Sequence, residues 1–202
     1  MDIKHIIMEY ILIGISILIS LVFHELAHGY ISHKLGDPTP SRDGRLTLNP
    51  MAHLDLFGTI CMVLFRFGWA KPVQINSQYY KDKKLGVVLV SLAGPCMNFI
   101  LALIGTLLMK LLPSSVFSIF ILYFISVNTS LGVFNLIPIP PLDGSKVLAA
   151  ILPEDLYFGY MKYEQYGMFI LMAILMTGIL NPVLNIMVEF MYKLYDILLF
   201  FI

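Results

Sequence analysis

The chain has 202 residues, of which 58% are hydrophobic and 13% charged, and its formal net charge is zero. This composition excludes an ordinary soluble domain and predicts a multi-spanning membrane protein. No block of like charges is present, so the sequence gives no sign of a nucleic-acid partner. At about 20 residues per crossing, the length allows five or six transmembrane or re-entrant helices, in an all-α integral-membrane domain over residues 1–202.

The first predicted helix covers residues 3–35 and ends at the breaker sequence Gly36-Asp37-Pro38. Its residues 10–23 include no charged side chain, which is typical of a membrane span. This apolar run leads directly into the pentapeptide His24-Glu25-Leu26-Ala27-His28. Ionisable groups inside a membrane are costly and usually serve a function, so the pentapeptide is the first candidate site.

His24 and His28 lie four positions apart, so a helix places both imidazoles on one face, within reach of a single metal ion. Glu25 projects about 100° around the helix from His24, near enough to act on a metal-bound water without being a ligand. The pattern therefore indicates two zinc ligands and a general base. This stretch alone leaves open an incidental helix whose histidines have other partners.

A polar region after the first helix predicts two short strands. Residues 45–48 alternate polar and apolar side chains, and residues 71–76 form the second candidate strand. Between them, residues 54–69 are apolar but too short for a full span, which favours a re-entrant hairpin or a short helix pair. The two strands would form a small sheet at the membrane surface, and its edge could pair with an extended peptide.

The next two predicted helices cover residues 85–112 and 116–134. Pro95 lies inside the first of them and is expected to kink it. Asn98 follows three residues later, and an amide at membrane depth needs hydrogen-bond partners. Asn98 therefore either joins neighbouring helices or serves a site, and the sequence leaves both roles open.

Residues 135–144 read NLIPIPPLDG, with three prolines in four positions, which excludes a regular helix. Irregular backbone at membrane depth is tolerated where protein buries it or a wet cavity adjoins it. A helix over residues 144–152 is predicted to follow, with Asp143 as its N-cap. Because catalytic zinc requires three protein ligands, Asp143 is also the best candidate for the third. Apolar segments at residues 166–180 and 183–201 complete the chain.

The basic residues predict the orientation. Ten lysines and arginines fall on the side that the first helix reaches and two on the other, when Lys193 in the last span is left out. By the positive-inside rule, the first helix then ends at the cytoplasm and the N-terminus lies outside. The active site of this cell-membrane protein is expected to open toward the cytoplasm.

Three motifs in order resemble the site-2 protease family, the intramembrane zinc metalloproteases of peptidase class M50. They are HELAH in the first helix, AGPxxN at residues 93–98 and NxxPxPPLDG at residues 135–144. The stretches GRLTLNPMAHLDLFGT and GWAKPV are similar to the small bacterial and archaeal members, without a PDZ or CBS domain. The core motifs cover residues 21–148, and residues 166–201 add C-terminal spans.

The resemblance implies one Zn²⁺ per chain, three protein ligands and a catalytic base that follows the first ligand. The ligands would be His24, His28 and Asp143, and the base Glu25. It also implies that Asn98 and Asn135 position the substrate or stabilise the tetrahedral intermediate. His53 and Asp55 belong to the resembling stretch, where hydrogen bonding within the loop is the expected role.

The implied activity is hydrolysis of peptide bonds in membrane-spanning protein substrates within the lipid bilayer. A regulatory partner and an oligomeric state do not follow from the sequence. One alternative is a channel or transporter that uses His24, His28 and Asp143 as an ion path, but it would not need the HExxH spacing. A catalytically silent scaffold is another, but it would be expected to have lost ligands that are all present here.

Overall fold

The structure, a computed structural model, describes residues 3–55, 58, 70–112, 116–153, 156, 160, 162 and 164–200. In these ranges the regular structure is helical, which confirms the predicted all-α class. The α-helices are α1 (Ile3–Lys34), α2 (Thr39–Arg42), α4 (Lys83–Leu111), α5 (Val116–Asn135), α6 (Asp143–Ile151), α8 (Gly167–Thr177) and α9 (Asn181–Leu198). Short 3₁₀ turns lie at Pro50–Ala52, Ser77–Tyr79 and Glu164–Tyr166.

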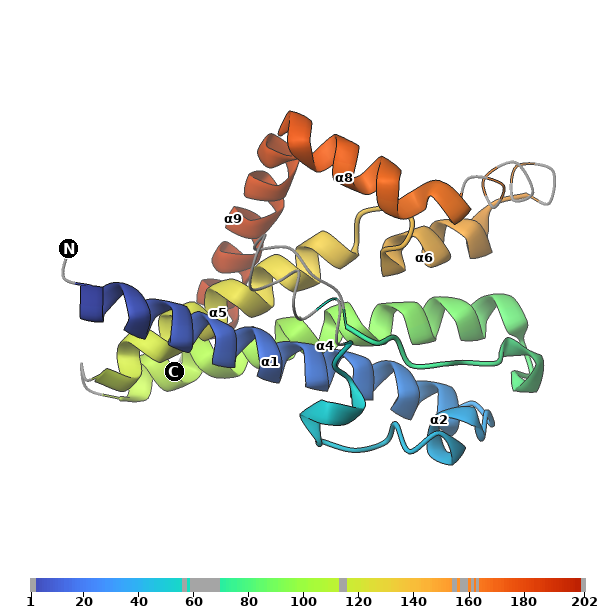
Figure 1. The fold of residues 1–202 in the computed structure, drawn as a ribbon, viewed down its shortest axis with the longest axis horizontal. Coiled ribbons are helices and arrows are strands. Elements are labelled where there is room, and N and C mark those ends of the chain that lie inside the picture. The colour runs from blue at the N-terminus through green and yellow to red at the C-terminus, as the bar shows by residue number, and fades with distance from the viewer. Residues whose placement is uncertain are drawn as a thin grey trace.

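Three helices, α1, α4 and α5, are long and apolar enough to cross a membrane. They pack against one another and run along the long axis of the molecule (Figure 1). Helices α8 and α9 meet at an angle of 88° and count as a fourth span only if the bent pair crosses as one. Of the five or six transmembrane or re-entrant helices predicted, the described residues therefore include three or four candidate spans. The predicted re-entrant segment falls mostly on residues 56, 57 and 59–69, outside them.

The predicted helices over residues 85–112 and 116–134 correspond to α4 and α5, and α4 continues through Pro95. These two helices approach closely at small residues. A Cβ added at Gly105 would lie 2.8 Å from the Ile125 side chain, and one at Gly132 would lie 2.5 Å from the Phe99 ring. Glycine at both positions allows the two backbones to pack without a clash, as is common between membrane helices.

The predicted sheet is wrong. Neither residues 45–48 nor residues 71–76 form a strand, and the described β pairing is a single antiparallel bridge between Leu54 and Ala70. Pro72 has no N–H to give to a ladder. The guanidinium of Arg45 instead donates to the carbonyl of Ala52 and, at 3.5 Å, to the carbonyl of Lys71, so a side chain joins the two segments where backbone pairing was expected.

Asp37 fastens the segment of residues 70–80 to the end of α1. Its buried carboxylate accepts hydrogen bonds from the Asn76 N–H at 2.7 Å, the Thr39 N–H at 2.9 Å and the Ser32 hydroxyl at 2.8 Å. The Ser32 hydroxyl also lies 2.7 Å from the Tyr80 hydroxyl. We call these five residues the Asp37 clamp. Gly36 follows the end of α1 and has a φ of +105°, a backbone conformation that residues with a side chain rarely adopt.

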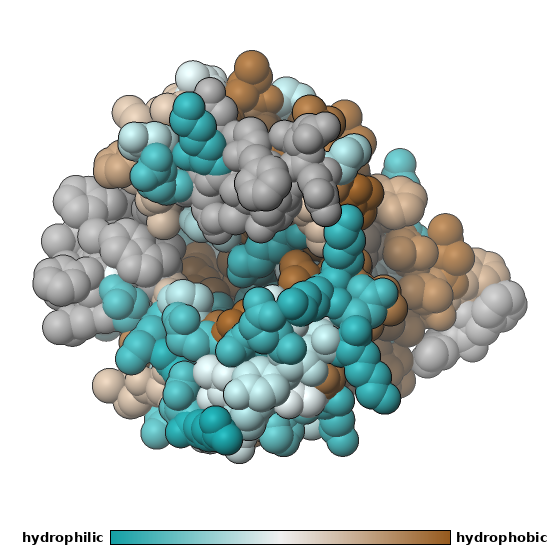
Figure 2. All heavy atoms as spheres, turned by 90° about the vertical axis from the view of Figure 1, so that its right-hand side faces the viewer, coloured by the Kyte–Doolittle hydropathy of each residue, from teal (hydrophilic) through white to brown (hydrophobic). Residues whose placement is uncertain are grey.

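The end of the molecule where α1 finishes and α4 begins is polar. Figure 2 looks onto this end and shows mostly hydrophilic residues. Lys34, Lys81 and Lys83 lie in this region and are exposed. A polar end beyond apolar helices is suited to the aqueous face of a membrane.

Candidate metal centre

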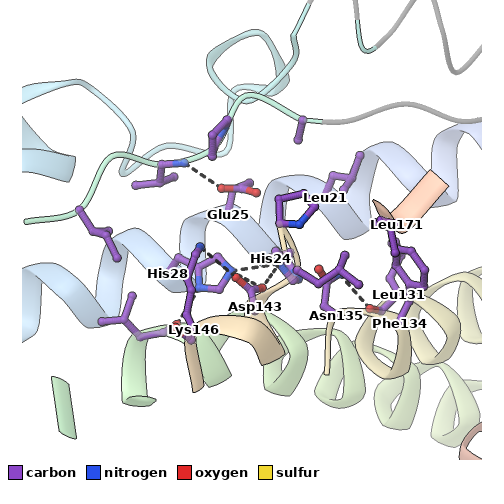
Figure 3. A pocket seen from close by; sticks show the side chains of 18 of the residues that line it. Leu21, His24, Glu25, His28, Leu131, Phe134, Asn135, Asp143, Lys146 and Leu171 are labelled. Atoms are coloured by element: carbon purple, nitrogen blue, oxygen red, sulfur yellow. Dashed lines mark hydrogen bonds and ion pairs between the residues drawn. The ribbon is translucent and has the colours of Figure 1, made fainter. Parts of the chain in front are cut away.

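His24 and His28 lie on α1, and Asp143 is the first residue of α6. The chain between α5 and α6 brings Asp143 to the two histidines (Figure 3). The Nε2 atoms of His24 and His28 are 3.0 Å apart. The Oδ2 atom of Asp143 lies 3.1 Å from His24 Nε2 and 3.0 Å from His28 Nε2. All three side chains are buried. The sequence predicted this trio as metal ligands, and they form a cluster that could hold a metal ion.

Hydrogen bonds fix the orientation of both imidazole rings. His24 Nδ1 lies 2.6 Å from the amide oxygen of Asn98, and His28 Nδ1 lies 2.7 Å from the carbonyl oxygen of Val90. Because a carbonyl oxygen only accepts, each Nδ1 carries the ring proton. A neutral ring with its proton on Nδ1 offers a lone pair at Nε2, and both Nε2 atoms lie within 3.1 Å of Asp143 Oδ2.

This donor set fits zinc. Two imidazole nitrogens and one carboxylate oxygen are among the ligand types of catalytic zinc sites. Donors in a tetrahedral zinc site are about 3.3 Å apart, close to the spacing of 3.0–3.1 Å between these three atoms. When both rings are neutral, three lone pairs converge on one point, and a metal ion held between them would remove their mutual repulsion.

Gly94 on α4 leaves the space that the three donor atoms need. A Cβ at this position would lie 2.5 Å from His24 Nε2 and closer still to His28 Nε2. Any side chain at residue 94 would therefore occupy the place where the histidine lone pairs converge. The motif AGPxxN contains this glycine one helical turn before Asn98, but the sequence analysis assigned it no role.

Asp143 was predicted to be the N-cap of α6, and this prediction is wrong. It is the first residue of the helix, and Leu142 is the N-cap, without a side-chain capping bond. The Asp143 carboxylate instead faces the two histidines, and its Oδ1 atom lies 3.4 Å from Lys146 Nζ. The proline-rich turn before α6 places this carboxylate opposite α1. A capping role would have directed it back to its own helix.

Glu25 lies in the same cavity as the three donors but is directed to a different partner. Its Oε2 atom accepts a hydrogen bond of 2.9 Å from the backbone N–H of Val73, in the segment that the Asp37 clamp holds (Figure 3). The carboxylate therefore stands beside the donor cluster and outside it. This is the placement that the HExxH pattern predicts for a residue that acts without ligating the metal.

Asn98 is fully buried between three helices. Its amide oxygen accepts a hydrogen bond from His24 Nδ1. Its Nδ2 atom donates hydrogen bonds to the Ser20 carbonyl at 3.3 Å and to the Asn128 amide oxygen at 3.0 Å. Asn98 therefore orients a histidine and also joins neighbouring helices, so both roles that the sequence left open are present. Its predicted contact with substrate stays a prediction.

Asn135, at the end of α5, lines the cavity, and its Nδ2 atom donates to the Leu131 carbonyl at 2.9 Å. One of the two amide N–H groups is thereby used. Its predicted role toward the substrate also stays a prediction.

His53 and Asp55 lie away from the cavity, in the loop after α2. His53 is buried and its Nε2 atom donates to the Thr47 carbonyl at 2.8 Å, while Asp55 Oδ1 accepts from the Gly58 N–H at 2.8 Å. These bonds match the expectation that both residues hold the loop together.

The cavity around the site measures about 310 Å³. Segments from α1, α4, α5, α6, α8 and the extended chain at residues 70–75 contribute to its wall. Apart from the site residues its lining is mostly apolar, with Ser91 and Lys146 as further polar side chains. The sequence analysis missed both, although Lys146 follows Asp143 by one helical turn and Ser91 precedes Gly94 by three residues.

Comparison with known proteins gives a consistent result. The sequence profile of "Peptidase family M50" matches residues 110–178. A protein of Bacillus subtilis described as "Putative zinc metalloprotease YwhC" is 38% identical over 196 residues, covering 90% of both chains. The "Zinc metalloprotease MJ0392" of Methanocaldococcus jannaschii is 27% identical over 185 residues, covering 88% of this chain and 46% of that protein.

A similar fold occurs in a solved structure, the "Site-2 Protease from Methanocaldococcus jannaschii". The TM-score is 0.54 and the identity 23%, and the match covers 92% of this chain and 76% of that one.

Proposed function

Because this chain belongs to peptidase family M50, the site-2 family of zinc metalloproteases, we propose that it hydrolyses peptide bonds of membrane-spanning proteins inside the bilayer. The observation that carries the proposal is the convergence of His24, His28 and Asp143 on one point, with Glu25 in the same cavity. These four are the residues that the sequence predicted as zinc ligands and base.

In the proposed reaction His24, His28 and Asp143 hold one Zn²⁺. When bound, zinc would lower the pKa of a coordinated water toward 7 and polarise a peptide carbonyl. The Nδ1–H bonds to Asn98 and Val90 keep both rings in the tautomer that ligation requires. The absence of a side chain at Gly94 leaves the two Nε2 atoms room to converge beside Asp143.

Glu25 is proposed as the general base. Its carboxylate accepts a proton from the attacking water and then gives it to the amine that leaves when the peptide bond breaks. The hydrogen bond from Val73 to Oε2 restrains the carboxylate and leaves the Oε1 atom as the oxygen that takes the proton. Restraint of this kind lowers the cost of arranging the reacting groups.

Water is proposed to reach the site from the cytoplasmic face, and the substrate has to unwind before it can be cut. The polar end of the molecule supports an opening toward the cytoplasm, as the lysine and arginine distribution predicts (Figure 2). A substrate helix shields its peptide bonds by its own hydrogen bonds, so its scissile segment has to unwind before Glu25 can act.

A reporter protein with one membrane span tests the proposal in proteoliposomes. The zinc-loaded wild type is expected to cleave the reporter. Glu25→Gln is expected to retain about one zinc per chain and lose cleavage, because the amide cannot accept the proton. Asp143→Ala is expected to lose both zinc and cleavage. Cleavage by Glu25→Gln would remove Glu25 as the base, and normal zinc content in Asp143→Ala would remove Asp143 as a ligand.

A further inference from the structure

Ser91 on α4 has a buried hydroxyl without a hydrogen-bond partner. The residue is 1% exposed and lines the cavity that contains His24, His28 and Asp143. Its Oγ atom has no hydrogen-bond partner among the described residues. Serines in membrane helices usually bond to a carbonyl of the preceding turn, as Ser16 does with the Leu12 carbonyl at 2.8 Å. An unpaired buried hydroxyl is costly, so its retention in this cavity calls for a reason.

The position of Ser91 on α4 is set by the metal-site contacts on either side of it. Residues 91, 94 and 98 share one face of the helix, because they are three and four positions apart. Gly94 faces the two histidine Nε2 atoms, and Asn98 binds His24 Nδ1. The carbonyl oxygen of Val90, the residue before Ser91, accepts a hydrogen bond from His28 Nδ1. Ser91 therefore lies about 4.5 Å along the helix from the glycine that borders the donor atoms.

The backbone at Ser91 is also exceptional. Pro95, four residues later, has no N–H to give to the Ser91 carbonyl, so the usual helical hydrogen bond is missing at this turn. The turn of α4 beside His24, His28 and Asp143 thus contains an unpaired side-chain hydroxyl and also lacks one backbone hydrogen bond. Helices tolerate such a turn where a cavity adjoins it.

The other donors around the site each have at least one partner, and Asn135 gives one of its two amide N–H groups to the Leu131 carbonyl. The Asn98 amide is bonded to Ser20 and Asn128, and Lys146 Nζ lies 3.4 Å from Asp143 Oδ1. The N–H of Val73 is given to Glu25. The Ser91 O–H is thus the uncommitted side-chain hydroxyl of the described cavity wall.

We propose that the Ser91 hydroxyl is a further catalytic residue, which donates a hydrogen bond to the scissile carbonyl oxygen of the substrate. The inference rests on the proposed protease function. As water attacks the carbonyl carbon, the π electron pair moves to the oxygen, and the Ser91 O–H stabilises the growing negative charge without transferring its proton. A donor that is unpaired before the reaction and paired during it contributes selectively to the transition state.

Ser91→Ala separates this role from a structural one. Removal of an unpaired hydroxyl is expected to leave the melting temperature unchanged or higher, and to leave zinc content unchanged. The kcat for reporter cleavage is expected to fall about 100-fold, with KM changed by less than about twofold. Ser16→Ala is the matched control, because it removes a buried serine hydroxyl from α1 that already has a partner. Its kcat is expected to equal that of the wild type.

Any one of three other results would overturn the inference. If Ser91→Ala cleaves at the wild-type rate, Ser91 is not a catalytic residue while the proposed function stands. If Ser91→Ala loses zinc or melts at lower temperature, the hydroxyl supports the fold and does not act on the substrate. If the zinc-loaded wild type itself fails to cleave the reporter, the proposed function fails and this inference fails with it.

Discussion

At the residue scale, Gly94 shows how a membrane helix can make room for a metal site. The two imidazoles of α1 approach α4 so closely that even a methyl group would enter the space between them. Glycine inside a helix usually lowers stability, and Gly94 lies inside α4. The close approach of the two histidine rings explains why glycine is needed there.

Gly94→Ala is expected to lower zinc content strongly. The new Cβ would lie 2.5 Å from His24 Nε2, so the ring has to turn away from the converging lone pairs. Metal analysis of the purified variant measures the effect. Gly14→Ala is the control, because nothing lies within 4 Å of a Cβ added there on the same helix as the histidines. Full zinc content in Gly94→Ala would contradict the packing described here.

Asn98 permits a test between two roles. If it orients His24, Asn98→Ala leaves the Nδ1 proton without an acceptor, and zinc affinity is expected to fall by about 10- to 100-fold. Asn128→Ala is expected to have a smaller effect of the same kind, because Asn128 holds Asn98. Competition with a chelator measures both affinities. Unchanged zinc affinity with reduced cleavage would instead favour the substrate role that the sequence predicted for Asn98.

At the element scale, the Asp37 clamp determines where the chain at residues 70–76 runs. This segment lines the cavity and gives the Val73 N–H to Glu25. Three residues further on, the Asn76 N–H is bonded to Asp37 at the end of α1. The end of the helix that carries the histidines thus also positions the segment that restrains the proposed base.

The clamp is expected to weaken in acid. Burial raises the pKa of Asp37, but hydrogen bonds from Thr39, Asn76 and Ser32 outweigh it and hold the pKa below its usual value. A carboxyl with a lowered pKa in the folded state contributes stability above its unfolded pKa, near 3.8, and this contribution is lost as the pH falls through the folded value.

Hydrogen exchange of the Asn76 amide measures this effect. Its protection is expected to be constant near neutral pH and to fall below about pH 4. Asp37→Ala is expected to have low protection at every pH, whereas Asp43→Ala, which removes an exposed carboxylate, is expected to behave as the wild type. Equal protection in wild type and Asp37→Ala at neutral pH would show that Asp37 does not hold the segment.

The predicted elements succeeded or failed for physical reasons. Long apolar runs have few conformational choices in a membrane, so the sequence predicted α1, α4 and α5 well. Short polar segments are decided by contacts made elsewhere. The segment at Arg45 forms no strand, and its side chain, instead of its backbone, bonds to the Ala52 carbonyl. Asp143 was predicted both to cap a helix and to bind metal, and only the position of α1 relative to α6 shows which partner its carboxylate meets.

The shared face of the two histidines followed from their spacing, and the surroundings of the candidate site did not. The HExxH pattern fixes the two histidines on one helix face before any tertiary contact forms. The roles of Gly94 and Ser91 depend on the distance between α1 and α4, which one helix sequence does not contain.

At the scale of the whole molecule, the ends of α1, α4 and α9 give its orientation. Lys110 Nζ donates to the Leu199 carbonyl at 2.6 Å, so the end of α4 lies beside the end of α9. Figure 1 shows the N- and C-terminal ends of the chain on this same side of the molecule. The lysines at the start of α4 lie at the other end.

Accessibility labelling is expected to place both ends of the chain on one side of the membrane. Tags at residues 1 and 202 should react with a membrane-impermeant reagent added outside intact cells. A cysteine at Lys83 should react only after the membrane is opened. The two native cysteines, Cys61 and Cys96, are replaced by serine in all variants so that they do not contribute to the signal. Tags on opposite sides would contradict the placement of the end of α9 beside the end of α4 that the bond from Lys110 to Leu199 shows.

Asp143 and His24 are separated by 119 positions along the chain. During synthesis the donor set is therefore incomplete until α6 has left the ribosome, after α1 and α4. On the proposed function, a nascent chain that still lacks Asp143 cannot cut neighbouring polypeptides at the insertion machinery.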